Sequence, residues 1–104
     1  MKNNKNGALT ASKVIEQLES HKAELHKFGV EKIGLFGSYI KDKSKGNSDL
    51  DFIVTFSDAT FDNYIELKFF LEVLFHKKID LVIEENLKPA LRYVKEEALF
   101  AEGV

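Results

Sequence analysis

The sequence is most informative first for what it lacks. Among its 104 residues there is no cysteine, one proline and one arginine. Without cysteine, disulfides, thiolate nucleophiles and zinc–cysteine sites are excluded, which fits a reducing compartment. The longest apolar cluster, Phe69 to Phe75, is interrupted by Glu72 and is far too short to span a bilayer. The polar start MKNNKNGALT lacks the apolar segment of a secretory signal. We therefore expect a cytoplasmic protein.

The charge balance is also unremarkable, at −2 net with 31% charged residues, so direct nucleic-acid binding is not indicated. No internal repeat or low-complexity linker divides the chain. We expect a flexible N-terminus over residues 1–9 and one domain over residues 10–104, which is long enough to fold without disulfides or a structural metal.

Helical and strand patterns alternate along the chain. The expected helices are a first one capped by Thr10 or Ser12 and ending near Phe28, a short one at Tyr39–Lys43 before a turn at 43–47, a long one at Phe61–Lys77, and a last one near Lys88–Glu97. The expected strands are Val30–Phe36, Asp49–Phe56, Lys78–Ile83 and a short edge strand at Leu99–Ala101.

The connections between these strands predict an α/β fold. The long helix joins the second and third strands, which should therefore be parallel, whereas the short link between the first and second favours antiparallel pairing. We predict a small mixed sheet of three to four strands with helices packed on it.

Two aspartates, Asp49 and Asp51, open the second strand. Side chains alternate along a strand, so both carboxylates project from one face, about 6–7 Å apart. At that distance they repel by about 3 kcal/mol at an effective dielectric near 20. A folded protein tolerates such a pair when water screens it or a cation neutralises it.

Three further residues fit the cation. If the third strand lies beside the second, Asp80 comes level with Asp51 and makes a cluster of three carboxylates, which suits Mg²⁺. Gly37 and Ser38, ten residues before Asp49, follow a strand. There a glycine lets the backbone approach a phosphate, and a helix N-terminus and a hydroxyl supply donors. Each feature alone has an ordinary structural explanation; their joint occurrence predicts a metal–nucleotide site.

This arrangement of Gly-Ser, ten residues, Asp-x-Asp and a later strand aspartate resembles the minimal nucleotidyltransferase (MNT) group of the DNA polymerase β-like superfamily. The resemblance covers about Val14 to Phe100 and includes the segment NLKPALR, Asn86 to Arg92. It implies that Asp49, Asp51 and Asp80 hold Mg²⁺, as two ions, and form the catalytic triad. It also implies that Gly37 and Ser38 bind the phosphates of ATP.

Many proteins of this group are antitoxins encoded beside a HEPN-domain ribonuclease toxin, in type VII toxin–antitoxin systems. The resemblance implies AMPylation, the transfer of AMP from ATP to a tyrosine of the toxin with release of pyrophosphate. The alternatives are an antitoxin that neutralises its toxin by stoichiometric binding, and a nucleotidyltransferase that acts on a small molecule or RNA. The lack of a second, acceptor-binding domain argues against the last.

The chain departs from the group after Gly37-Ser38. Relatives often have Ala-Arg-Gly where this chain has Ile40, Lys41 and Asp42. Lys41 keeps a positive charge for the nucleotide but lacks the planar fork of arginine, and Asp42 adds a negative charge beside the phosphate pocket. These changes affect nucleotide affinity or rate and leave the metal ligands intact.

Two other sets of residues have both a structural and a functional explanation. The basic run Lys41, Lys43 and Lys45 is either a solvated turn or a site of phosphate or RNA attraction. The aromatic set of Tyr64, Phe69, Phe70 and Phe75 is explained mainly by core packing, with some members available as a docking patch. The three histidines receive no ligand role.

Overall fold

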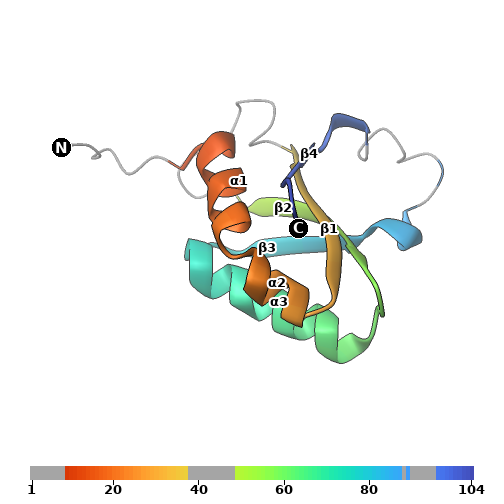
Figure 1. The fold of residues 1–104 in the computed structure, drawn as a ribbon. Coiled ribbons are helices and arrows are strands. Elements are labelled where there is room, and N and C mark those ends of the chain that lie inside the picture. The colour runs from red at the N-terminus through yellow and green to blue at the C-terminus, as the bar shows by residue number, and fades with distance from the viewer. Residues whose placement is uncertain (1–8, 38–48, 88, 90–95) are drawn as a thin grey trace.

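The computed structural model describes residues 9–37, 49–87, 89 and 96–104. Its strands form one sheet in the order β3-β2-β1-β4 (Figure 1). The strands are β1 (Val30–Phe36), β2 (Leu50–Phe56), β3 (Ile79–Ile83) and β4 (Leu99–Phe100). The helices are α1 (Ala11–Ser20), α2 (Lys22–Lys27), α3 (Phe61–Phe75) and a 3-10 turn, η2 (Glu84–Asn86).

The sheet is mixed, as predicted. β2 pairs antiparallel with β1 and parallel with β3, while β4 adds antiparallel to the outer side of β1. The parallel pair is joined through α3, because parallel neighbours need a crossover of this kind. The predicted α/β architecture with four strands is confirmed.

The first predicted helix is interrupted at His21. Thr10 caps α1 by accepting a hydrogen bond from the backbone N–H of Lys13 at 3.2 Å. His21 leaves helical geometry: its backbone N–H donates to Leu18 three residues back, and its ring Nδ1 lies 2.8 Å from the Gln17 carbonyl oxygen. α2 then continues to Lys27. The spacing of apolar residues predicts both helical segments. It does not reveal that the His21 ring, in place of the His21 backbone N–H, lies against the Gln17 carbonyl oxygen.

The core lies between the helices and one face of the sheet. Alternate residues of β2, namely Phe52, Val54 and Phe56, belong to it together with Leu67 and Leu71 of α3. Alternation along the strand places Asp51, Ile53 and Thr55 on the other face. The helices of the described residues thus cover one face of the sheet (Figure 1), and the other face carries Asp51 beside the fully buried Ile53.

Several predictions fall outside the described residues. These are the flexible N-terminus up to residue 8, the short helix at Tyr39–Lys43 and its turn, and most of the helix at Lys88–Glu97. Within the described residues, no helix is both long and apolar enough to cross a membrane.

Candidate active site

The pairing register brings the two strand aspartates together. Asp51 of β2 is aligned with Asp80 of β3 across the parallel pair and with Phe36 of β1 across the antiparallel pair. The backbone N–H of Leu50 donates to the Lys78 carbonyl oxygen at 3.1 Å and extends this pairing toward Asp49. The prediction that Asp80 comes level with Asp51 is therefore confirmed.

Both carboxylates lie on the face of the sheet opposite α1, α2 and α3. Ile79 and Leu81, on either side of Asp80, are buried in the core, while Asp80 is exposed. Asp51 is half-buried between two core residues, and Asp49 is exposed just before β2 begins. The three acids thus form a group that solvent and a substrate can reach.

The electrostatics of this group are unfavourable without a cation. The pKa of Asp51 is raised from 3.8 to about 6 by burial, by the charges of Asp80 and Asp49, and by a hydrogen bond with Asp80. Such a bond between two carboxyl groups needs a proton on one of them. Asp51 therefore holds a proton to higher pH than an ordinary aspartate.

Gly37 completes the described part of the site. It has a left-handed backbone with φ +86°, which favours glycine. A Cβ built at this position would collide with a carboxylate oxygen of Asp51. The glycine thus makes room for the Asp51 side chain at the end of β1. From the sequence, Gly37 was predicted to let a phosphate come close to the backbone. The structure shows that it also leaves room for the Asp51 carboxylate.

The donor set suits a hard cation, although its side chains are not arranged as a closed ligand shell. Within the described residues, no three acidic or histidine side chains converge on a single metal position. Oxygen-only groups with one or two protein carboxylates are what Mg²⁺ takes, with phosphate oxygens and water completing its shell. Asp49, Asp51 and Asp80 fit that description, and a cation would replace the proton between Asp51 and Asp80.

Other predicted site residues lie outside the described part of the chain. These are Ser38 and Lys41, both predicted to bind nucleotide; Asp42, which departs from the family pattern, lies outside it as well. The roles of these residues, and of the three aspartates, remain predictions.

The sequence predicted only part of an exposed apolar surface on α3. Of the aromatic set named above, Phe69 is exposed, Phe70 is partly buried and Phe75 is buried. Tyr64 packs against the core and donates a hydrogen bond to the Leu81 carbonyl oxygen at 2.8 Å. Phe61, Ile65 and Val73 are exposed as well, and their spacing of four and eight residues was the signal that could have found them.

Comparison with known proteins agrees with this geometry. Residues 13–99 match the family described as polymerase beta, nucleotidyltransferase. Protein adenylyltransferase MntA of Thermococcus cleftensis is 39% identical over 85 residues, which cover 80% of this chain and 86% of that protein.

The solved structures that resemble this one include a provisionally named minimal nucleotidyltransferase. It has a TM-score of 0.75 and 28% identity, covering 89% of this chain and 97% of that one. A toxin–antitoxin structure with AMP-PNP has a TM-score of 0.65 and 24% identity over 83% of this chain and 73% of that one.

A third structure holds a tri-AMPylated HEPN toxin of Shewanella oneidensis in complex with its MNT antitoxin. Its TM-score is 0.60 at 22% identity, with coverage of 86% of this chain and 73% of that one. The last two likenesses are evidence of a shared fold. Taken with the match over residues 13–99 and the identity to MntA, they confirm the predicted family: the chain belongs to the polymerase β nucleotidyltransferases and is a minimal member homologous to the MntA protein adenylyltransferases.

Proposed function

We propose that this chain is a Mg²⁺-dependent protein adenylyltransferase, the antitoxin of a HEPN/MNT pair, which transfers AMP from ATP to a tyrosine of its HEPN toxin. The observation that carries the proposal is the alignment of Asp51 with Asp80, beside Gly37, on the face of the sheet opposite α3. The similarity to MntA supports the acceptor being a protein. Because ATP and Mg²⁺ are both needed, we expect the chain to act in the cytoplasm.

Asp49, Asp51 and Asp80 would hold the metal. Bound Mg²⁺ would neutralise charge on the phosphates as it develops and orient the reacting oxygens. The role of Asp51 in this is to supply a carboxylate whose raised pKa reflects an electrostatic cost that the cation removes. Gly37 keeps that carboxylate at the end of β1 by offering no side chain against it.

The reaction itself is a displacement at the α-phosphorus of ATP. The tyrosine oxygen of the partner forms a new bond to that phosphorus, the bond to the bridging oxygen breaks, and pyrophosphate leaves. The phenolic proton goes to a base, which is either Asp80 or a residue that the partner brings. Gly37, Ser38 and Lys41 would hold the triphosphate.

The test is a labelling reaction. The purified chain is incubated with ATP labelled at the α-phosphate, Mg²⁺ and the HEPN protein encoded beside it. We expect label on the partner with the wild type and none with Asp49→Ala/Asp51→Ala. Glu24→Ala, a change to an exposed acid on α2, is the matched control and should label normally.

Two other outcomes point elsewhere. If the toxin is neutralised equally well by the wild type and by the double aspartate variant, without label, the chain acts by stoichiometric binding. The replacement of the usual Arg-Gly by Lys41 and Asp42 favours this alternative. Label on a small acceptor or on RNA would instead indicate the third class of function.

A further inference from the structure

The outward side of α3 carries a row of exposed apolar side chains. Phe61, Ile65, Phe69 and Val73 are spaced four residues apart and are 75%, 41%, 67% and 60% exposed; we refer to these four residues as the α3 stripe. At 1.5 Å per residue the row is about 18 Å long. Single exposed apolar residues are ordinary, whereas an aligned row containing two phenylalanines is typical of a protein contact surface.

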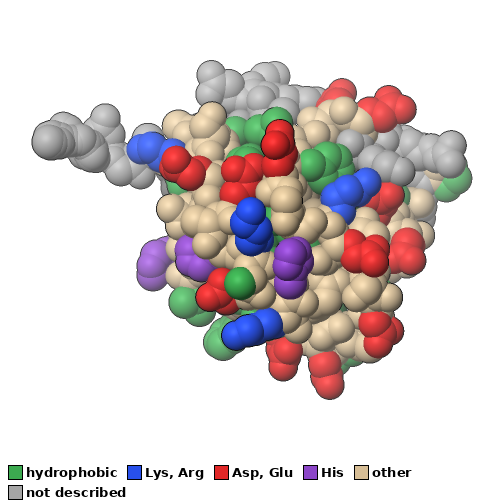
Figure 2. Space-filling model, viewed as in Figure 1, with side chains coloured by type: hydrophobic (Ala, Val, Ile, Leu, Met, Phe, Trp, Pro, Cys, Tyr) green, Lys and Arg blue, Asp and Glu red, His purple; other side chains and the backbone are tan. Residues whose placement is uncertain are grey.

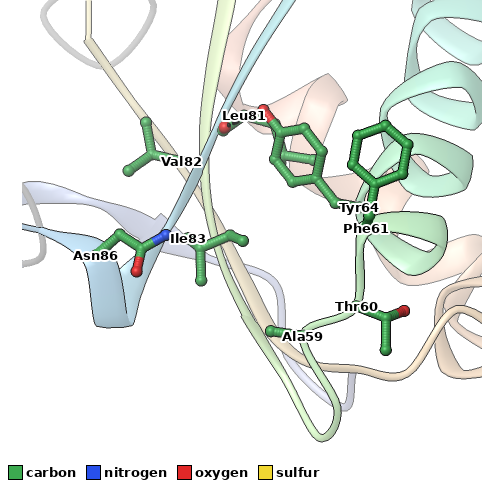
Figure 3. A pocket seen from close by; sticks show the side chains of 8 residues that line it. All are labelled: Ala59, Thr60, Phe61, Tyr64, Leu81, Val82, Ile83 and Asn86. Atoms are coloured by element: carbon green, nitrogen blue, oxygen red, sulfur yellow. Dashed lines mark hydrogen bonds between the residues drawn. The ribbon is translucent and has the colours of Figure 1, made fainter.

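The α3 stripe leads into a pocket at its N-terminal end. The pocket has a volume of about 420 Å³ and lies between the start of α3, the strand β3 and the turn η2. Figure 3 shows Phe61 and Tyr64 on the first turn of α3, with Leu81, Val82 and Ile83 across from them on β3. The hydrogen bond from Tyr64 to Leu81 fixes one wall. A mainly apolar pocket beside an apolar row can hold an anchoring side chain of a partner.

The residues that border this surface are mostly acidic, and the lysine among them, Lys68, is paired with Glu72 at 3.4 Å. Asp58, Asp62 and Glu66 are all exposed, and the last two each directly follow a member of the α3 stripe. In Figure 2 acidic side chains gather along the lower right edge, where the N-terminal half of α3 lies in Figure 1. A partner that fits must therefore combine apolar side chains with Lys or Arg at their margin.

The α3 stripe and the candidate active site lie on different sides of the sheet. Leu67 and Leu71 of α3 pack into the core against one face of the sheet, so the stripe points away from the sheet. Asp51 and Asp80 lie on the sheet's other face. Binding at α3 and chemistry at the carboxylates therefore use opposite sides of the molecule.

We propose that the α3 stripe and its pocket form a docking surface for a protein helix with an apolar ridge flanked by basic residues. A row at four-residue spacing is the ridge that packs best against another helix. The proposal rests on the proposed function only in taking that helix to belong to the acceptor protein.

A second copy of this chain fits less well. In an antiparallel arrangement centred on the stripe, Glu66 lies one residue from the midpoint and meets its own counterpart, which is unfavourable. An anionic membrane surface would likewise meet the acidic margin.

The consequence is that holding the partner and modifying it are separable. Four side chains fall short of the roughly 800 Å² per partner that a stable complex buries, so the pocket and the acidic margin must contribute. Loss of the stripe should weaken the complex and leave the reacting groups in place.

The experiment measures the dissociation constant of the purified chain and the co-encoded HEPN protein by calorimetry. With Phe69→Gln/Val73→Gln we expect Kd to rise at least tenfold, because glutamine keeps the helix and removes the apolar contact. With Glu66→Lys we expect a smaller rise that shrinks in high salt. The matched controls are Leu99→Gln, an exposed apolar residue on β4, and Glu16→Lys, an exposed acid on α1.

Labelling of the same partner at saturating concentration distinguishes the two proposals. The stripe variants should label at the wild-type level, and Asp49→Ala/Asp51→Ala should bind normally without labelling. Binding that is unchanged in Phe69→Gln/Val73→Gln would overturn the docking surface. The docking surface would also be overturned if the wild type formed a dimer that Phe69→Gln/Val73→Gln made monomeric. Binding of the wild type to anionic vesicles through the α3 stripe would overturn it too. If the wild type binds through the stripe and never labels, the docking surface stands and the proposed function fails.

Discussion

The two faces of strand β2 illustrate how one short segment serves stability and chemistry at once. On one face Phe52, Val54 and Phe56 are buried against the helices. On the other, Asp51 is aligned with Asp80 and carries a raised pKa. The first face lowers the free energy of the folded state by removing apolar surface from water, and the second raises it by crowding charges. Substitutions on the two faces should therefore affect different measurements.

The largest expected effect is on catalysis. Asp51→Asn keeps the shape of the side chain and removes its charge, so transfer should fall by at least about 10³-fold, equivalent to about 4 kcal/mol of transition-state stabilisation. Because the change also removes repulsion from Asp80 and Asp49, unfolding by urea should show equal or higher stability. A variant that is inactive because it is unfolded would contradict the separation of the two faces.

The core face should behave in the opposite way. Leu71→Ala, at a fully buried position of α3, should lower the free energy of unfolding by about 2–5 kcal/mol. The folded fraction should retain transfer activity per molecule, measured at low temperature where the variant remains folded. A large loss of activity per folded molecule would show that the core positions the carboxylates closely, and would weaken the comparison.

A substitution at Gly37 should change both stability and the candidate site, because Gly37 lies against the Asp51 side chain. Gly37→Ala places a methyl group against the Asp51 carboxylate on a backbone of positive φ. We expect a loss of about 1–3 kcal/mol in stability, from strain at that φ and from displacement of the carboxylate. Affinity for Mg²⁺, measured by calorimetry, should fall with it. An alanine variant with wild-type metal affinity would mean that the Asp51 side chain can move without consequence.

The smallest effect concerns pH. The folded-state pKa of Asp51, about 6, lies above its ordinary value of 3.8. The contribution of this group to stability is therefore full below pH ~4 and lost as pH rises through 6. Solvent screening reduces the effect to about 1–2 kcal/mol. Denaturation without metal at pH 5 and pH 7.5 should show the decline, and Asp51→Asn should flatten it. If the stability of Asp51→Asn fell equally between pH 5 and pH 7.5, the pH dependence would belong to another titrating group.

Much of this fold could be predicted because its signals are local. Val30–Phe36 has the bounds predicted for it, and the helical crossover was sufficient to predict the parallel pairing that aligns Asp51 with Asp80. What could not be predicted depends on tertiary contacts. The interruption at His21 arises from one ring nitrogen near one carbonyl oxygen.

The α3 stripe is a second feature that the sequence alone could not predict. The helix is apolar on most of its circumference, so spacing alone identifies several apolar rows without saying which one faces the sheet. Leu67, Leu71 and Phe75 of this helix are buried. Phe61 and Val73 are equally apolar and remain outside because the sheet can cover only one side.

The end of α3 lies close to the candidate site along the chain. His76 closes the helix in a left-handed conformation, φ 54°, and Asp80 follows only four residues later. Side chains alternate along β3, so a one-residue shift of β3 against β2 would turn Asp80 into the core and Ile79 toward solvent. The carboxylate of Asp80 therefore meets that of Asp51 only while β3 keeps its observed register against β2.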